Sequence, residues 1–271
     1  MLDHFYMSDA GYHELTMHTL GSHMPRSYIV KECRHKMNSF RVLETIAVGD
    51  VKGAQYDFYE LLQDEIIAYL KDAEISGDDG GAPVEEIMVK IAGDGATMSR
   101  NSSFQMLSFT LLNRRPDMLK TGNVRTVVCV NGSESYETLR DGMGKVFEQI
   151  NQLVKDGTIT VNGQTFPVEV FMCGDFKYKQ KVLGLKDSTA DQGCPHCLVK
   201  AADHHDMTKP VSYYDEGDMA RSLQKMQSGE LQPGQKHKPL LKFPLGASSL
   251  VNNLCCCELL MSWKGMLFWR L

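Results

Sequence analysis

The stretch IMVKIAGDG, residues 87–95, decides how the chain can fold, because an apolar run ends there in an aspartate between two glycines. A mostly apolar run of this length, with Lys90 as its one charged residue, predicts a buried strand. A carboxylate at the end of a buried strand is costly unless a cation meets it. Asp94 is therefore either a turn residue that caps backbone amides, as Asp beside Gly commonly is, or a ligand for a cation.

A second apolar run ends in the same way at Asp175, in VEVFMCGD (residues 168–175), 81 positions (175 − 94) further along the chain. The pattern between the two aspartates predicts strands at 104–112 and 124–130, a helix at 135–154 and a hairpin at 158–166 that turns at Asn162-Gly163. The order is three strands, a helix and a further strand. Both aspartates therefore close a predicted strand.

Carboxylates on adjacent strands can jointly bind a divalent, oxygen-seeking cation such as Mg²⁺, which keeps positions open for substrate phosphate. Two such ions activate the attacking oxygen and stabilise the leaving one in phosphodiester chemistry. That chemistry needs at least one more carboxylate besides Asp94 and Asp175.

The N-terminal part of the chain has a different pattern. Residues 1–76 carry apolar side chains at helical spacing, and Ser8 can cap the first helix, so we expect a helical segment. Residues 76–83, SGDDGGAP, predict a linker and a domain boundary. The strand pattern begins after that linker, at about residue 84, and predicts an α/β domain with a mixed sheet.

Composition excludes several classes of protein. The 271 residues are 42% hydrophobic and 23% charged, which is typical of one or two globular domains. A formal charge of −5 argues against a uniformly basic nucleic-acid coat, although a local basic groove remains compatible with it. The sequence lacks both a run of ~18 apolar residues and the layout of a secretory signal. We therefore expect an intracellular protein that is not secreted, has no membrane partner and keeps its eight cysteines as thiols or metal ligands.

The motif Cys194-Pro195-His196-Cys197 places two thiols two residues apart. This spacing suits one half of a tetrahedral zinc site. A redox dithiol is the competing interpretation, but that motif usually begins a helix directly after a strand, whereas this one follows a polar loop. The other two zinc ligands are not evident, since adjacent His204 and His205 point apart and Cys255–Cys257 matches no ligand spacing.

Taken together, DGATMSR (residues 94–100) and GDFKYKQKVLGLKDSTADQGCPHC (residues 174–197) resemble the Transib transposases and their relatives, which include the catalytic subunit of the V(D)J recombinase. The resemblance covers residues 86–200 well and residues 8–70 more loosely. It implies an RNase H-like core with a DDE carboxylate triad and a zinc-binding insert. Asp94 and Asp175 match the first two catalytic aspartates, which would hold Mg²⁺ or Mn²⁺. Cys194 and Cys197 match the zinc cysteine pair.

The chain departs from the family pattern after the cysteine pair. Only 74 residues (271 − 197) follow Cys197, and they contain no H-x₄-H pair of the kind that completes the family's zinc site. Residues 191–245 match the start of the zinc-binding insert, whereas residues 246–271 form a divergent tail. Glu258, in this tail, is a weak candidate for the missing catalytic Glu.

We therefore expect a helical segment over residues 1–76, an RNase H-like mixed sheet over 84–190 and a partial zinc-binding insert. The resemblance implies a nuclear protein that forms a homodimer and acts on double-stranded DNA rather than on a small molecule. Its activity would be metal-dependent DNA cleavage and strand transfer, impaired by the missing third carboxylate. The alternative is a domesticated, non-catalytic DNA- or protein-binding remnant with a zinc half-site.

Overall fold

The computed structural model describes residues 8–18, 24–39, 41–75, 84–99, 102–114, 120–206, 208–210, 212–215 and 217–242. The chain divides into two compact units, residues 1–43 and residues 44–271. Glu258, Cys255–Cys257 and the whole divergent tail lie outside the described residues, as does the predicted linker at 76–83. In the described part of the chain, no helix is long and apolar enough to span a membrane.

The first unit contains two helices, α1 (Asp9–His18) and α2 (Ser27–Ser39). The helix α1 begins as predicted, since the Ser8 hydroxyl oxygen accepts a hydrogen bond from the Gly11 amide at 3.1 Å. Tyr12 on α1 is buried, and its hydroxyl donates to the Pro25 carbonyl at 2.9 Å. Tyr12 therefore ties α1 to the segment that leads into α2.

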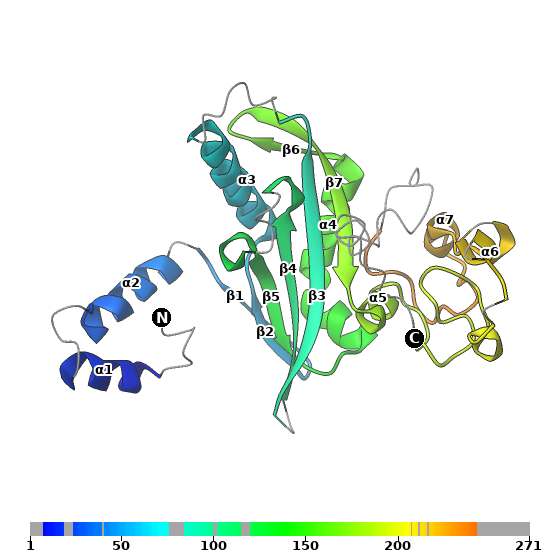
Figure 1. Ribbon diagram of the computed structural model, residues 1–271, viewed down its shortest axis with the longest axis horizontal. Coiled ribbons are helices and arrows are strands. Elements are labelled where there is room, and N and C mark those ends of the chain that lie inside the picture. Colours follow the sequence, from blue (N-terminus) through cyan, green and yellow to red (C-terminus); the bar gives the residue numbers. More distant parts are fainter. Residues whose placement is uncertain are drawn as a thin grey trace. The chain divides into compact units, whose positions relative to one another are not determined.

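The second unit is a seven-stranded mixed sheet with helices packed on it (Figure 1). The strand order is β1-β2-β5-β4-β3-β7-β6, and every neighbouring pair is antiparallel except β3 and β7, which run parallel. The strands are β1 (Glu44–Val48), β2 (Val51–Gln55), β3 (Ile87–Ser99), β4 (Ser102–Leu111), β5 (Arg125–Asn131), β6 (Thr158–Val161) and β7 (Gln164–Gly174). The larger helices are α3 (Phe58–Ile75), α4 (Tyr136–Asp156) and α5 (Phe176–Val182). The predicted α/β class is confirmed.

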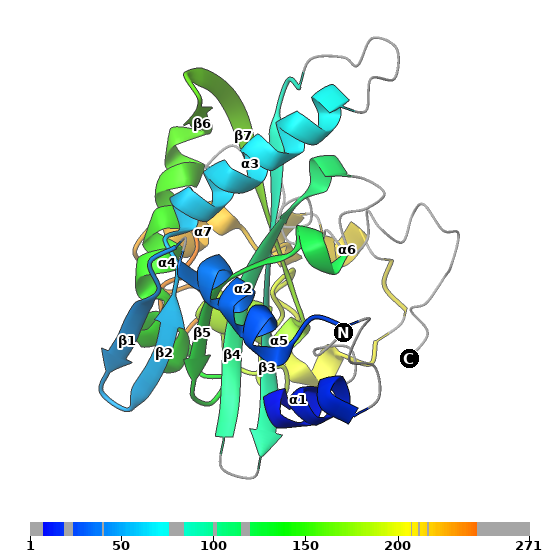
Figure 2. The same cartoon turned by 90° about the vertical axis from the view of Figure 1, so that its left-hand side faces the viewer.

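One face of the sheet carries the core, and α3 and α4 lie together against it (Figures 1 and 2). Alternate residues of β3 point into this core, as the period of a strand requires. The helix α4 buries the apolar stripe that its sequence predicts, which comprises Leu139, Met143, Val146, Phe147, Ile150 and Leu153. It begins at Ser135, whose side chain accepts from the Thr138 amide, and ends at Gly157, whose φ is +63°. The hairpin turn is also confirmed, with Asn162 at φ +50° and Gly163 at +82°.

The opposite face of the sheet holds only a small apolar cluster. Leu112, Phe171 and Cys173 are buried there, and Met88 and Ala92 pack against them. The two sides of β3 therefore differ, with Ile87, Val89 and Ile91 in the main core and Met88 and Ala92 on the other face. Because side chains alternate along a strand, Asp94 lies on the same face as Ala92.

Residues 44–55, which we expected to belong to a helical segment, form instead the β1–β2 hairpin, and β2 pairs with β5. The physical reason is local. Thr45, Ile46 and Val48 are β-branched residues that favour a strand, and Gly49 adopts the left-handed φ of +57° at the turn. The boundary between the two units therefore falls between residues 43 and 44. We expected it after α3, but α3 packs on the sheet.

A buried ion pair fixes α3 to the sheet. Glu65 on α3 is 1% exposed, and its two carboxylate oxygens accept from Arg114 Nε at 2.8 Å and from Arg125 Nε at 2.6 Å. Arg114 also donates to Asp72 at 2.7 Å. One carboxylate thus joins the helix to the end of β4 and to the start of β5.

In the described part of residues 184–242, which follow α5, the helical elements are short: η4 (Ala201–Asp203), α6 (Ser212–Asp215), η5 (Gly217–Met219) and α7 (Leu223–Gln227). Two isolated β-bridges pair Leu185 with Gln235 and Cys197 with Ala220. The end of this segment returns to the core. The Leu240 amide donates to the Val182 carbonyl at 2.8 Å, and Asn151 on α4 bonds both the Leu240 carbonyl and the Lys242 amide, at 2.8 and 2.6 Å. Tyr136 stacks on His237 with ring centroids 4.2 Å apart. The segment is therefore held against α4.

Candidate metal site

Asp94 and Asp175 lie at neighbouring positions of the sheet. The parallel strands β3 and β7 are paired as far as Gly93 and Gly174, so the two aspartates are the next residue on each strand. Both are exposed to solvent. Asp94 accepts a hydrogen bond from the Gly95 amide at 2.8 Å, and Asp175 caps α5 by accepting from the Tyr178 amide at 2.6 Å. Each aspartate therefore makes the backbone hydrogen bond that the turn interpretation expects, and the ligand interpretation stays a prediction.

One detail of the predicted strand is wrong. β3 does not end at Asp94 but continues to Ser99, paired with β4 throughout. What ends at Gly93 is its pairing with β7, because the β7 chain turns into α5 after Gly174. Asp94 therefore marks the place where β3 loses one of its two neighbours.

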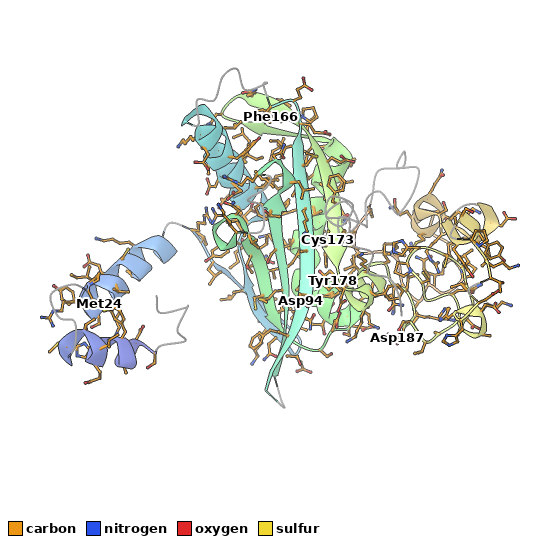
Figure 3. The ribbon with its side chains drawn as sticks, in the orientation of Figure 1. Met24, Asp94, Phe166, Cys173, Tyr178 and Asp187 are labelled. Atoms are coloured by element: carbon orange, nitrogen blue, oxygen red, sulfur yellow. The ribbon has the colours of Figure 1, made fainter. Side chains whose placement is uncertain are left out.

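The two glycines before the aspartates are required by the ring of Tyr178. A Cβ on Gly93 would lie 1.8 Å from Tyr178 Cζ, and a Cβ on Gly174 would lie 2.9 Å from Tyr178 Cδ1. Tyr178 is fully buried, and this burial raises the pKa of its hydroxyl far above the usual value. Figure 3 shows Tyr178 next to the end of β3 that carries Asp94. The ring thus supports both carboxylate-bearing strand ends.

Glu134 is a third acidic residue at this end of the sheet, and sequence reasoning missed it. It lies between β5 and α4, and its Oε2 accepts from Lys177 Nζ at 2.7 Å. That hydrogen bond raises the pKa of Lys177, and the charges of Asp175 and Asp187 add to the effect. The Lys177 ammonium therefore pairs with Glu134 in an acidic environment. An acidic residue before a helix is common because it favours the helix dipole, so the sequence alone carried no signal for this role.

Metal binding at this end of the sheet has to be judged from the donors. In the described parts of the chain, no three His, Cys, Asp or Glu side chains lie close enough together to hold a metal ion. The donor chemistry of Asp94 and Asp175 nevertheless fits Mg²⁺, which is usually bound by one or two carboxylates and several waters. Their exposure leaves room for such waters. The pair fits a hydrated divalent ion rather than a closed protein cage.

Cys194 and Cys197 also lie together, in the loop that follows α5. A hydrogen bond between the two thiols lowers the pKa of Cys194 to about 5 and raises that of Cys197. The His196 amide also donates to Cys194 Sγ at 3.4 Å. Two thiols provide half of a zinc site, and among the described residues no third ligand joins them. The donors present therefore do not form a complete zinc site.

Arg221 organises this cysteine loop. The arginine is 5% exposed, and its guanidinium donates to the carbonyls of Gln192, Cys194 and Pro233 at 2.5, 2.8 and 3.0 Å. The Arg221 amide donates in turn to the His196 carbonyl. Sequence reasoning missed this residue, because a lone arginine 24 positions (221 − 197) after the motif is not distinctive.

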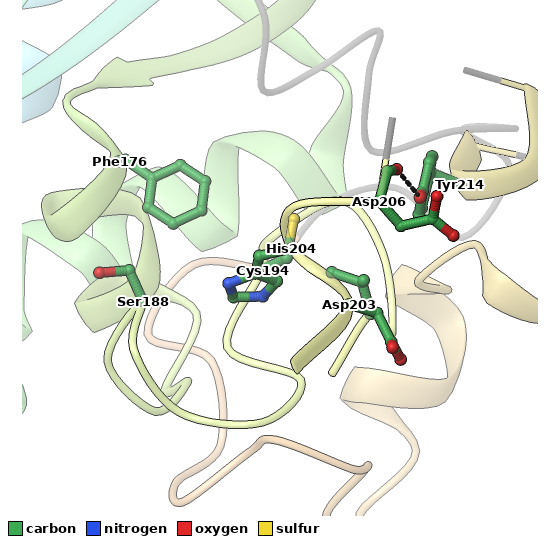
Figure 4. Close-up of a pocket in the computed structure, with 8 residues that line it drawn as sticks. Phe176, Ser188, Cys194, Asp203, His204, Asp206 and Tyr214 are labelled. Atoms are coloured by element: carbon green, nitrogen blue, oxygen red, sulfur yellow. Dashed lines mark hydrogen bonds between the residues drawn. The ribbon is translucent and has the colours of Figure 1, made fainter. Parts of the chain in front are cut away.

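A pocket of about 300 Å³ opens beside Cys194 (Figure 4). Phe176, which directly follows Asp175, lies on one side and Tyr214 on the other, with Cys194 and His204 between them. The pocket thus lies next to the start of α5, where Asp175 is.

No family model matches this chain, and no curated protein matches it.

Proposed function

We propose that this chain carries the RNase H-like core of a DDE-type transposase or recombinase, with divalent-metal-dependent cleavage and strand transfer of double-stranded DNA as its activity. The observation that carries the proposal is the pairing of Gly93 with Gly174 on parallel strands, which makes Asp94 and Asp175 neighbours. Mg²⁺ or Mn²⁺ bound there would activate the attacking water or 3′-hydroxyl and stabilise the leaving oxygen.

The sheet topology supports this proposal. Three consecutive antiparallel strands, β3, β4 and β5, are followed by α4 and then by β7, which runs parallel to β3. This order of three strands, a helix and a further strand is the one that the sequence predicts for the core. The hairpins β1–β2 and β6–β7 extend the sheet at its two edges.

The chain's own residues would act as follows. Asp94 and Asp175 would hold the metal from two adjacent strands. Among the described residues no third acidic side chain joins Asp94 and Asp175, and the Lys177 ammonium neutralises Glu134. The activity would therefore be impaired, as the sequence predicts.

The alternative function is a non-catalytic DNA- or protein-binding remnant. One observation favours it: within the described residues, no three potential ligands are gathered into a metal group. In this case Cys194 and Cys197 would hold Zn²⁺ together with ligands from a partner.

Nicking of supercoiled plasmid by the purified chain with Mg²⁺ or Mn²⁺ tests the proposal. We expect nicking that requires the metal and is lost in Asp94→Asn and Asp175→Asn. Asp50→Asn is the matched control, because Asp50 is an equally exposed aspartate in the β1–β2 turn.

Nicking by Asp94→Asn and Asp175→Asn equal to that of the unchanged protein would refute the assignment of the site. Plasmid binding without any nicking, together with zinc retained only when a partner is present, would instead support the alternative. The proposal also implies a nuclear location and a homodimer. Analytical ultracentrifugation of the DNA-bound chain would test the homodimer.

A further inference from the structure

The sheet has two edge strands, β1 and β6, and their outer sides are covered differently. On β6 the Thr160 carbonyl accepts a hydrogen bond from Gln63 of α3 at 3.2 Å. On β1 one side pairs with β2, and no hydrogen bond from the described residues reaches the backbone of the other side. The edge at β1 is therefore the open one in the described part of the chain.

The register of the β1–β2 hairpin shows which backbone groups of β1 point outward. Val48 and Val51 flank the two-residue turn and so form a hydrogen-bonded pair, and such pairs alternate along an antiparallel ladder. The next residue of β1 that bonds β2 is Ile46. The N–H and C=O groups of Thr45 and Ala47 therefore point away from β2, and a row of this kind is a template for another strand.

The strand β1 lacks the features that normally protect an edge. Its sequence, ETIAV, contains no Lys and no Pro, and its pairing with β2 has no bulge. Its single charge, on Glu44, is already paired with Lys145 of α4. Val48 is 49% exposed, and Val42 and Leu43, just before the strand, are exposed as well. This edge is therefore apolar and carries no unpaired charge.

A second copy of β1 fits this edge. In an antiparallel pair centred on Ile46, Thr45 of each copy faces Ala47 of the other, so the outward N–H and C=O groups bond one another. Ile46 faces Ile46 of the second copy as a non-hydrogen-bonded pair, in which side chains are closest and β-branched residues pack well. Val48 lies diagonally beside Ile46 of the second copy, so its exposed surface is covered.

Charge selects this register over its neighbours, because like charges directly opposite each other are destabilising. Centred on Ile46, the pair places Glu44 opposite Val48. A pair centred on Ala47 would place Glu44 opposite Asp50, and a parallel pair in register would place the two Glu44 side chains together. A pair centred on Thr45 would leave Val48 beyond the end of the other strand.

We propose that β1 is the surface through which two copies of this chain associate, edge to edge, into one continuous sheet with a twofold axis at Ile46. The proposal deepens the homodimer that the proposed function implies, because it names the surface and the register. It does not involve Asp94 or Asp175, so it can be tested without metal or DNA.

Sedimentation velocity of the full chain, without metal or DNA, measures the dimer. Ala47→Pro removes an outward N–H and no bond to β2, so we expect the dissociation constant of the dimer to rise by roughly tenfold or more. Ala47→Lys places a charge at the same exposed position and should act in the same way, even if proline disturbs folding. Thr158→Lys, at an exposed position of the other edge strand, is the matched control and should leave the dimer unchanged.

A dimer that is as tight in both Ala47 variants as in the unchanged protein would overturn the proposal. An unchanged protein that stays monomeric would overturn it too.

Cysteine cross-linking tests the register. Ile46→Cys should form a disulfide between copies, because Cα atoms of a non-hydrogen-bonded pair lie about 4.5 Å apart, within the span of a disulfide. Ala47→Cys should not, because it faces Thr45 of the second copy. The unchanged protein sets the background, since its own cysteines include the exposed Cys33. Cross-linking of Ala47→Cys equal to or above that of Ile46→Cys would show that the register is wrong.

Failure of this proposal and failure of the proposed function have different signatures. If the Ala47 variants stay dimeric while nicking depends on Asp94 and Asp175, another surface joins the copies and only the β1 contact is refuted. If the Ala47 variants become monomeric and the unchanged protein nicks no DNA, the proposed function fails and the β1 contact stands.

Discussion

Gly93 packs against the buried ring of Tyr178, and the methyl group of an alanine at this position would overlap with the ring. The added carbon would lie 1.8 Å from Tyr178 Cζ. Carbon atoms pack at about 3.5–4.0 Å, so the ring or the strand must move by about 1.7 Å or more. The ring is 0% exposed and cannot move without disturbing its neighbours.

The expected loss of stability follows from this geometry. Overpacking a filled core costs about 1–3 kcal/mol. If the ring is instead expelled, about 150–250 Å² is exposed at about 25 cal/mol per Å², which amounts to roughly 4–6 kcal/mol. We therefore expect Gly93→Ala to lower the free energy of unfolding by about 3 kcal/mol. With a urea m-value of about 3 kcal/mol/M, the midpoint falls by about 1 M.

Urea unfolding followed by far-ultraviolet circular dichroism measures this shift. Gly144→Ala is the control, because a Cβ at Gly144 meets nothing within 4 Å and Gly144 is interior to α4. Alanine there should stabilise the helix by about 0.5–1 kcal/mol. The two glycine-to-alanine changes should therefore shift the midpoint in opposite directions.

A midpoint for Gly93→Ala equal to or above that of the unchanged protein would refute the close packing of Tyr178 on Gly93. A double-mutant cycle sharpens the test. In a Tyr178→Leu background the ring is absent, so the penalty of Gly93→Ala should largely disappear. An undiminished penalty would show that some other contact of Gly93 is responsible.

Three further changes test other parts of the structure. Glu65→Gln leaves Arg114 and Arg125 without their shared carboxylate and should lower the free energy of unfolding by about 3–5 kcal/mol; a urea midpoint within error of the unchanged protein would contradict this. Arg221→Met removes the guanidinium hydrogen bonds to the Gln192 and Cys194 carbonyls and should loosen this loop, seen as faster exchange of the backbone amides over residues 192–198, while exchange in β3 stays the same. Alkylation of Cys194 by iodoacetamide should be fast at pH 6–7 and slow as the pH falls through about 5, because the thiolate persists above its lowered pKa; a rate that rises only above pH 8 would oppose this.

Sequence periodicity predicted the elements whose determinants are local. The strand at Ile87–Ala92, the apolar stripe of α4 and the Asn162-Gly163 turn each depend on residues within one element. The β1–β2 hairpin was missed although its β-branched residues favour a strand, because it lies between two helical patterns and its partner is the distant β5. The length of β3 was missed for a similar reason, since Gly93 to Ser99 is held by β4 and not by its own apolar pattern.

The candidate site was predicted in part. Asp94 and Asp175 were found because each follows an apolar strand, and the parallel pairing of β3 and β7 makes them neighbours. Glu134 and Arg221 were not found, because each depends on partners distant in sequence. The partner of Glu134 is Lys177, and those of Arg221 are carbonyls in residues 192–196 and at Pro233. Neither carries a local motif.

The loss of β7 as a neighbour at Gly93 also has a mechanical consequence. Up to that residue β3 is held by hydrogen bonds on both sides, and from Asp94 onward it is held by β4 alone among the described residues. The end of β3 can therefore bend together with β4 without breaking any β3–β7 bond. Asp175 stays anchored at the start of α5. Bending of this two-stranded end would thus change the separation of the Asp94 and Asp175 carboxylates. Any partner that pushes on the end of β3 and β4 would change the same separation.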